Sequence, residues 1–349
     1  MEFGSNPNLY RGVFLLFVFL LSMVLLFSSL CVSVFDGNIS SFVSEVPDQV
    51  VVNTEAELIN AVDNAVGSTV IALNGDITLL WSLVISGNKN ITLTSNRATG
   101  FYKLIGPNDQ STIGISAGGV LTIDGIIVTH ETGDGGSGVA VGGALIMVDG
   151  EISGNYANRV GNGGGVTNYG VFTMLGGTIS NNTAHSGGGV LSGFDCFFVM
   201  SGGKISDNSA EFGGGVHMMS GSFVMEGGEI ISNAASRGGG VYLYAGNIRN
   251  VDPIYDGSFV MSGGKISGNT AEQGGGVYNR DGTFKLSGGI VFGNAASKGS
   301  GDVYNDVGVV YYFGVRAVVV ICVSVVLVVV GVIVFVGFFY SKKQKRGLQ

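Results

Sequence analysis

Cysteine, proline and charged residues are all scarce in this chain of 349 residues, which has 3 Cys, 4 Pro and 12% charged residues. Cys31 and Cys322 fall in apolar segments near the ends, so Cys196 stands alone in the middle and an intrachain disulfide framework is excluded there. The 61 Gly come with little Pro and without a period of three, which excludes collagen and a Pro/Gly linker. A chain so rich in glycine that is still 46% hydrophobic needs many tight turns around a packed core.

Basic residues are few in the middle of the chain, where residues 36–313 contain 24 acidic and 11 basic side chains. This acidic balance argues against nucleic acid as a partner. Basic residues gather instead in the last nine positions, as Lys342, Lys343, Lys345 and Arg346.

Two long apolar runs flank this middle part. Residues 1–35 predict a signal peptide or an uncleaved N-terminal membrane anchor, followed by a linker over residues 36–47. Residues 313–340 predict a transmembrane helix, and the basic tail 341–349 after it predicts a cytoplasmic C-terminus. The chain is therefore expected to pass the cell membrane once, or twice if the first segment stays, with residues 48–312 outside the cell and the lipid bilayer as a partner.

A repeat of about 25 residues runs through residues 145–303, with the pattern F-x-M-x-G-G-x-I-S-x-N-x-A-x-x-G-G-G-V. Each unit supplies three short strands, with Gly pairs and triplets at the corners, where positive φ or close backbone approach is needed. No helical period is present, which excludes an α-solenoid. The pattern predicts an all-β chain, a single-stranded right-handed parallel β-helix of about 10 coils.

An asparagine recurs once per coil. We expect it to point inward at a corner and to bond to the asparagine of the next coil, forming a ladder. The members of this structural ladder are Asn182, Asn208, Asn233, Asn269 and Asn294. The same alignment predicts an outward row in which Lys204, Glu229 and Lys265 alternate in charge.

The part before the clear repeats is degenerate. Thr54 and Glu57 have capping-box spacing, which predicts a short amphipathic helix that covers the first coil. Segments 69–73, 77–85, 91–94 and 120–128 are expected to be strands of the early coils.

Gly188-Gly189-Val190, with Ile179 three residues before Asn182, resembles the repeats of the polymorphic outer membrane protein family. The whole body is also similar to the pectin-lyase-like right-handed β-helix superfamily and to adhesin-like surface proteins. The resemblance implies the fold more than a function. The chain departs from the outer membrane family in having a single apolar segment near its C-terminus instead of a barrel, which disfavours a bacterial outer membrane.

Polysaccharide lyases and hydrolases of this superfamily use clustered Asp with Arg or Lys on one outer face, and we find no such cluster. Glu131 with Asp134 and Asp252 with Asp256 are the loose acidic pairs, and we interpret both as loops. The three His fall at different repeat phases, so no metal site is expected, and no cofactor is implied. No catalytic residue is assigned.

One candidate surface follows from strand alternation. The residue after each Gly-triplet Val points outward, which would stack Tyr242, Tyr278 and Tyr304 into an exposed aromatic ladder beside His217. Stacked Tyr that only support a parallel sheet are the plainer interpretation, and it is the one we favour. An 11-residue insertion after Tyr244 could frame the ladder with further ligand-binding residues, Arg249 and Tyr255.

These observations favour a cell-surface, adhesin-like repeat protein that binds extracellular glycans or neighbouring cell surfaces without catalysis. A membrane-tethered, pectate-lyase-like polysaccharide lyase or hydrolase is the alternative, and a stalk without a ligand is a third reading. Sequons at Asn38, Asn90 and Asn181 would allow glycosylation.

Overall fold

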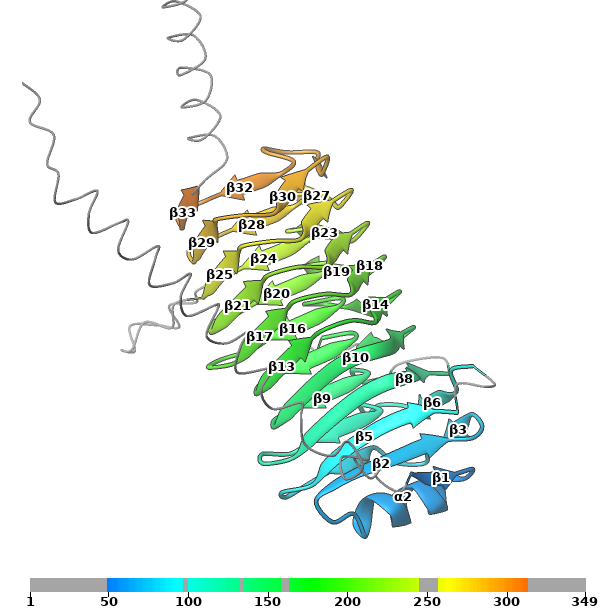
Figure 1. Ribbon diagram of the computed structural model, residues 1–349. Helices are drawn as coiled ribbons and strands as arrows, with labels where there is room; N and C mark the ends of the chain where they lie inside the picture. The colour runs from blue at the N-terminus through cyan, green and yellow to red at the C-terminus, as the bar shows by residue number, and fades with distance from the viewer. Residues whose placement is uncertain (1–48, 97–99, 132–134, 158–162, 245–256, 313–349) are drawn as a thin grey trace, which may run out of the picture. The chain divides into compact units, whose positions relative to one another are not determined.

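The chain folds as a parallel β-solenoid of about nine turns (Figure 1). The structure is a computed structural model that describes residues 49–312, apart from 97–99, 132–134, 158–162 and 245–256. The strands pair in parallel from one turn to the next, as the sequence repeat predicts. Nine strands in one of its sheets give one turn fewer than the ten expected.

Sheet A contributes two of the faces. On its first face lie β1 (Val50–Val52), β2 (Ser68–Leu73), β5 (Asn90–Ser95), β8 (Val120–His130), β10 (Ala144–Ser153), β13 (Val171–Met174), β17 (Phe197–Met200), β21 (Ser222–Met225), β25 (Ser258–Met261), β29 (Thr283–Leu286) and β33 (Val309–Tyr312). On its second face lie β3 (Ile77–Thr78), β6 (Lys103–Gly106), β14 (Thr178–Ser180), β18 (Lys204–Ser206), β22 (Glu229–Ile231), β26 (Lys265–Ser267) and β30 (Ile290–Phe292). The long strands β8 and β10 run through both faces and join them into one sheet.

Sheets B and C complete each turn. Sheet B consists of β4 (Leu83–Ile85), β7 (Ile113–Ile115), β9 (Val139–Val141), β12 (Val166–Asn168), β16 (Val190–Ser192), β20 (Val216–Met218), β24 (Val241–Leu243), β28 (Val277–Asn279) and β32 (Val303–Asn305). Sheet C consists of β11 (Tyr156–Ala157), β15 (Thr183–Ala184), β19 (Ser209–Phe212), β23 (Ala234–Arg237), β27 (Thr270–Gln273) and β31 (Ala295–Ala296).

Two expectations about strands need correction. Sheet C adds a fourth strand to the repeating coils, where three were expected, because the residues after each ladder Asn pair with the next coil before the glycine corner. Segment 77–85 is not one strand but two, β3 and β4, which belong to different sheets. Leu79 is buried between them at the corner, so an apolar residue there did not mean a continuing strand.

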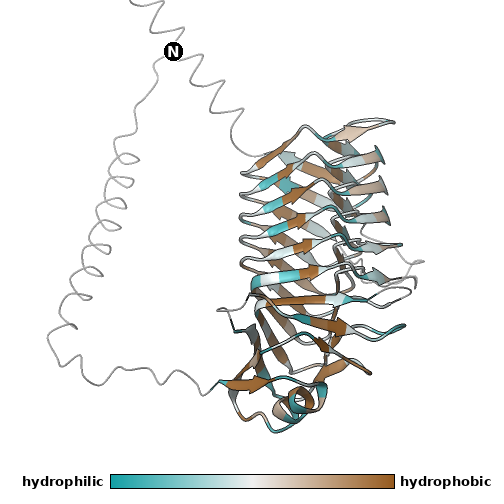
Figure 2. Ribbon diagram, turned by 90° about the vertical axis from the view of Figure 1, so that its right-hand side faces the viewer, coloured by the Kyte–Doolittle hydropathy of each residue, from teal (hydrophilic) through white to brown (hydrophobic). Residues whose placement is uncertain are grey.

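Identical side chains stack inside the solenoid. Phe172, Phe198, Phe223, Phe259 and Phe284 are fully buried, with neighbouring ring centroids 4.5 to 4.9 Å apart and nearly parallel planes. Rows of Met and Ile run beside them. Figure 2 shows hydrophobic positions recurring in the strands from one coil to the next. This repetition lets each coil bury its apolar face against its neighbours, since no single coil could bury it alone.

The ladder asparagines bond from coil to coil. Asn182 Nδ2 donates to Asn208 Oδ1 at 3.0 Å, and the Asn182 backbone N–H donates to the same oxygen at 3.0 Å. The same pair of bonds repeats from Asn208 to Asn233 and onward along the row. Each amide also donates to an Ile carbonyl of the preceding coil, such as Ile152 O for Asn182. Buried polar side chains are satisfied in this way.

The Gly triplets are needed where one coil lies directly on another. A Cβ on Gly189 would lie 2.6 Å from Gly215 O and 3.1 Å from Asn208 Nδ2. Gly187, the first of its triplet, has a φ of 64°, which L side chains rarely adopt. The second and third positions are therefore fixed by close packing, and the first by backbone conformation.

Helix α2 (Glu55–Asp63) covers the N-terminal end of the solenoid next to β1 and β2 (Figure 1). Thr54 Oγ1 accepts from the Glu57 N–H at 3.3 Å, and Glu57 Oε2 accepts from the Asn53 N–H at 2.7 Å, as expected of a capping motif. Leu58 and Val62 face the core, whereas Ile59 is exposed.

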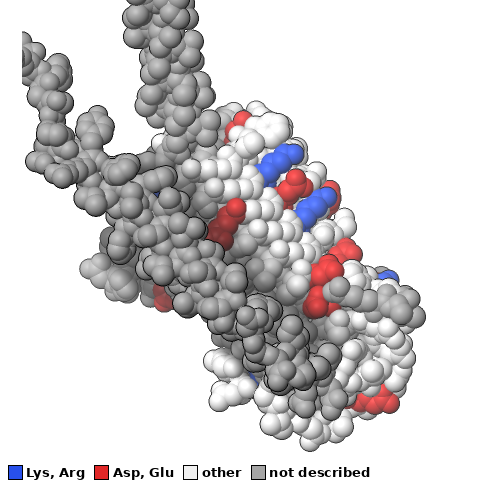
Figure 3. All heavy atoms as spheres, in the orientation of Figure 1, with Lys and Arg blue, Asp and Glu red and all other residues white. Residues whose placement is uncertain are grey.

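The outward charge row has the expected register, with Lys204 paired to Glu229 and Glu229 to Lys265. Figure 3 shows basic and acidic side chains alternating along this part of the surface. Within the described part of the chain, no helix has the length and apolar character to cross a bilayer. The predicted membrane segments, 1–35 and 313–340, lie outside the described residues.

Candidate functional site

One row of side chains runs along the outer face of sheet B. The outer residues of its strands are aligned from coil to coil, while the residues flanking them, such as Val190 and Val216, belong to the core. The row changes from small to aromatic along the solenoid and reads Val84, Gly114, Ala140, Thr167, Leu191, His217, Tyr242, Tyr278 and Tyr304. Cavities lie along both halves of this face.

The aromatic half forms the expected stack. Tyr242 and Tyr278 have ring centroids 5.2 Å apart, and Tyr278 and Tyr304 5.0 Å apart, with planes inclined by 25° and 19°. His217 meets the Tyr242 ring edge-on at 4.9 Å. The structure thus brings together four of the residues that the sequence proposed for binding.

The expectation that this ladder is exposed is wrong, because Tyr242 is 3% and Tyr278 5% accessible. Phe212, at the end of β19 in sheet C, lies over the row with its ring centroid 5.3 Å from that of Tyr242. The guanidinium carbon of Arg237 lies 5.6 Å from the centroid of the Phe212 ring. The fourth strand of the coil, which the sequence analysis missed, supplies this cover.

The half with small side chains contains the larger cavity, which we call the N-terminal groove. Its volume is about 630 Å³. Its lining mixes apolar and polar side chains. The apolar ones are Val84, Ile115, Ala140 and Val141, and the polar ones, beside Asp109 and Tyr169, are Ser82, Gln110, Ser111, Ser116, Ser137 and Thr167. Gly114 lies in the row beneath it, and a Cβ there would meet no atom within 4 Å. The groove is hollow because the side chains of this part of the row are small.

Several of the groove's hydroxyls already have partners in the protein. Ser82 Oγ donates to Ser111 O at 2.5 Å, and Ser137 Oγ shares a bond of 2.5 Å with Thr167 Oγ1. Tyr169 is 49% accessible, and Trp81, next to Ser82 in the chain, is 70% accessible. Among the described residues that line the groove, Asp109 is the single carboxylate.

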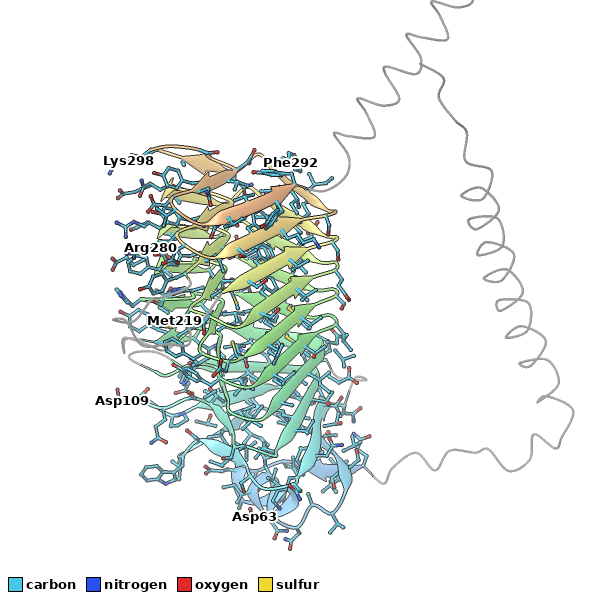
Figure 4. The ribbon with its side chains drawn as sticks, turned by 90° about the vertical axis from the view of Figure 1, so that its left-hand side faces the viewer. Asp63, Asp109, Met219, Arg280, Phe292 and Lys298 are labelled. Atoms are coloured by element: carbon cyan, nitrogen blue, oxygen red, sulfur yellow. The ribbon has the colours of Figure 1, made fainter. Side chains whose placement is uncertain are left out.

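The aromatic half contains a smaller cavity of about 240 Å³, which we call the His217 pocket. It is lined by His185, Ser186, Phe212, His217, Met219, Tyr242, Tyr244 and Arg280. Asp109, Met219 and Arg280 project from the same side of the solenoid in Figure 4. A third cavity of about 190 Å³ follows, lined by Arg237, Tyr278, Arg280 and Asp306.

His217 differs from the other polar residues of the row. It is 6% accessible, and neither ring nitrogen has a hydrogen-bond partner. Burial, with a contribution from the nearby His185, lowers the pKa of His217 to about 3, so the imidazole is neutral at physiological pH. His185 itself pairs with Glu211 at 3.1 Å on a more accessible part of the surface.

Arg280 is held by two tyrosines. Its guanidinium lies 4.9 Å from the centroid of the Tyr244 ring. Its hydrogen bond with the Tyr242 side chain raises the pKa of Arg280, while burial raises the pKa of Tyr242. The pocket therefore has an accessible cation that packs on a tyrosine ring, a neutral imidazole and aromatic walls.

The remaining sequence proposals fall elsewhere. Arg249, Tyr255 and the acidic pair of the insertion lie outside the described residues. The ladder asparagines are buried, except for the partly accessible Asn294, and line none of these cavities. No group of three or more His, Cys, Asp or Glu that could hold a metal ion occurs in the part of the chain that the structure describes.

Sequence reasoning missed the N-terminal groove because the clear repeats begin at residue 145, after most of the residues that line it. The signal was available, however, since Gly114 and Ala140 occupy the phase that holds Tyr in later coils. Comparisons with protein-family models, with curated proteins and with solved structures found no significant match to this chain.

Proposed function

We propose that this chain is a membrane-anchored protein of the cell surface that binds extracellular glycans in the N-terminal groove, in the manner of an adhesin and without cleaving them. The observation that carries the proposal is a hollow that combines hydroxyl and amide groups with apolar surface and with the accessible ring of Tyr169. Sugars are bound by this combination, because their hydroxyls need hydrogen-bond partners and their C–H faces pack on rings.

The groove is a better candidate than the tyrosine ladder. A ring that is to pack against a sugar must be open to a molecule of that size. Tyr169 is 49% accessible, whereas Tyr242 is 3% accessible and lines only the small His217 pocket. The ladder then supports the sheet on which the groove is built, and replacing its buried Tyr would test folding more than binding.

The finer fold assignment is also part of the proposal. We take the solenoid to be right-handed, of the pectin-lyase-like type, because parallel strands joined through a crossover are right-handed in nearly all proteins. The coils of about 25 residues and the internal asparagine ladder are in keeping with the polymorphic outer membrane protein and adhesin resemblance.

Accessible apolar side chains at the C-terminal end of the solenoid support the membrane anchor. Phe292 of β30 is 49% and Tyr312 of β33 66% accessible, and Val307 between β32 and β33 is 74% accessible. They precede the apolar run 317–340 and its basic flank. Apolar and aromatic groups are favourable at a lipid interface, so this end of the solenoid would face the membrane.

The test is a glycan array probed with the full-length chain, followed by affinity measurements on any sugar found. Gly114→Phe is the informative variant, because a Cβ at Gly114 meets no atom within 4 Å and the new ring would occupy the groove. It should reduce affinity at least about tenfold while leaving the unfolding midpoint nearly unchanged. Gly75→Phe is the matched control, since a Cβ at Gly75 also meets nothing within 4 Å but Gly75 does not line the groove.

Each alternative has its own result. Absence of binding to any glycan would reject the proposal and leave the stalk or a protein-binding adhesin. Shortening of a bound polysaccharide, detected by mass spectrometry and lost in Asp109→Asn, would favour the lyase or hydrolase instead.

A further inference from the structure

The His217 pocket contains a buried polar group that nothing in the protein satisfies. A neutral imidazole has one N–H donor and one acceptor nitrogen, and in His217 both are shielded from solvent and both lack a partner. Buried polar groups without partners are costly and rare in folded proteins, and they call for a specific explanation. The ladder Asn of the same coils, by contrast, are all bonded.

We propose that the His217 pocket is a binding site for a small para-hydroxylated aromatic acid, with the ligand hydroxyl on His217, its ring against Phe212 and Tyr242, and its carboxylate on Arg280. This is a second site, separate from the N-terminal groove in its lining residues and in the chemistry of its ligand.

The aromatic lining of the His217 pocket favours a ligand with an aromatic ring. Phe212, Tyr242 and Tyr244 present aromatic surfaces, and Met219 adds a polarizable thioether, which packs well on rings. A sugar in this pocket would leave most of its hydroxyls without partners, because nearly all of the surface that the pocket presents is apolar. A flat apolar ring has no such requirement.

Tyr242 lies beside both of the polar side chains that the ligand would bind. Its ring contacts His217 at 4.9 Å between centroids, and its hydroxyl bonds to Arg280. The imidazole and the guanidinium thus both lie next to the Tyr242 side chain. A ligand ring lying along Tyr242 would place one para substituent near each of them.

The charge states of Arg280 and His217 indicate which polar groups the ligand carries. Arg280 is cationic, and it favours a carboxylate, which guanidinium groups bind in two parallel hydrogen bonds. His217 stays neutral at physiological pH, so it favours a hydroxyl, which can both donate and accept. Glu211, the nearby carboxylate, is already paired with His185.

The size of the pocket agrees with such a ligand. About 240 Å³ is below the range of pockets that hold drug-sized molecules and suits a single ring with two small substituents. With about ten heavy atoms, such a ligand should bind in the micromolar to millimolar range.

The first test uses the full-length chain labelled with ¹⁵N in its histidine rings. The chain has 3 His, so each ring can be followed separately. Titration with 4-hydroxybenzoate should move the two ring ¹⁵N signals of His217 in a saturable way and leave those of His130 unchanged. Benzoate lacks the hydroxyl and phenol lacks the carboxylate, and each should bind about tenfold more weakly.

Two variants assign the two ends of the ligand. His217→Phe keeps the ring volume and should weaken 4-hydroxybenzoate about tenfold but leave benzoate unchanged. Arg280→Met should weaken 4-hydroxybenzoate and benzoate but leave phenol unchanged. Arg237→Met is the matched control, because it removes a guanidinium from the same face that does not line the pocket.

The outcomes are separable. Saturable binding with this pattern of losses establishes the site. The proposal is overturned if 4-hydroxybenzoate at about 10 mM leaves the His217 signals in place, or if His217→Phe weakens benzoate as much as 4-hydroxybenzoate. Because the test needs no glycan, it can fail or succeed independently of the N-terminal groove.

Discussion

Asp302 ends the asparagine ladder by accepting two hydrogen bonds from Asn294, one from the backbone N–H and one from Nδ2, both at 3.0 Å on Oδ1. Asp302 stands where the preceding coil has Gly276, as the backbone pairing of Val277 with its carbonyl shows. A Cβ at Gly276 would lie 2.8 Å from Asn294 Nδ2, which belongs to the next coil. In the last coil that neighbour is missing, so a side chain fits and replaces the missing asparagine oxygen.

Asp302→Gly restores the glycine of the repeat but should weaken the last coil. The backbone N–H and the side-chain amide of Asn294 lose their acceptor. We expect the free energy of unfolding to fall by about 1–3 kcal/mol, because donors without a protein partner are unfavourable. Hydrogen exchange should speed up in β30 to β33 and remain slow in β13 to β22, since coils contact only their neighbours. Asp302→Asn keeps an acceptor and is the control. Equal loss in both variants would mean that charge, not the ladder oxygen, matters.

Asn208→Leu should be far more harmful than a change to an exposed asparagine nearby. Asn208 accepts from two Asn182 groups and donates to Asn233 Oδ1 and Ile179 O, all at 2.9 to 3.0 Å. Removing it orphans several buried groups at once, so we expect a loss of at least about 3 kcal/mol in the free energy of unfolding. Denaturant titration measures it.

The control for this variant is Asn181→Gly. Asn181 is exposed and has a φ of 55°, a conformation that glycine adopts more readily. We expect a change within about 1 kcal/mol. If the two variants were equally destabilised, the ladder would not be a main source of stability.

The phenylalanine stack offers a pair of adjacent residues. Phe198 is fully buried between Phe172 and Phe223, with centroids at 4.7 and 4.5 Å, whereas Phe197 is 58% accessible. Phe198→Ala should cost about 3–5 kcal/mol and Phe197→Ala well under 1 kcal/mol. Thermal unfolding of both variants gives the comparison. A small effect of Phe198→Ala would show that neighbouring coils close the cavity.

The repeat made most of the fold predictable. Wherever the F-x-M and I-S-x-N signatures recur, one alignment fixes the inward rows, the ladder and the charge register of Lys204 and Glu229. Prediction was weaker where the repeat is eroded, as in segment 77–85. There the apolar residues continue around a corner, and alternation alone cannot show that the chain turns.

The solvent accessibility of the site residues could not be predicted from the sequence. Strand alternation correctly placed Tyr242 and Tyr278 on the outer face of sheet B, but the outer face of a strand is accessible only if nothing folds over it. Phe212 does so, and its strand follows no pattern that a single sequence reveals. The groove at Gly114 and the unsatisfied ring of His217 likewise depend on contacts between coils.

The stability of the chain should depend on pH through His217. Its pKa in the folded state is about 3 and in the unfolded state about 6.5, so the unfolded chain binds a proton more readily between these values. The stabilisation is therefore complete above about pH 6.5 and is lost as the pH falls toward 3. Between pH 7 and pH 5 the free energy of unfolding should fall by about 2 kcal/mol.

His217→Phe should flatten this dependence and stabilise the chain at pH 7, because two unsatisfied nitrogens are removed. Urea titrations at pH 7 and pH 5 measure both effects. Groups facing His217 include Tyr242, Arg280 and His185, and His185→Gln is the control because its side chain is 37% accessible and pairs with Glu211. Hydrogen bonds lower the pKa values of Glu57 and Glu272, so these two carboxylates change the stability mainly at more acid pH. If the wild type and His217→Phe lost the same stability between pH 7 and pH 5, the buried imidazole could not be its source.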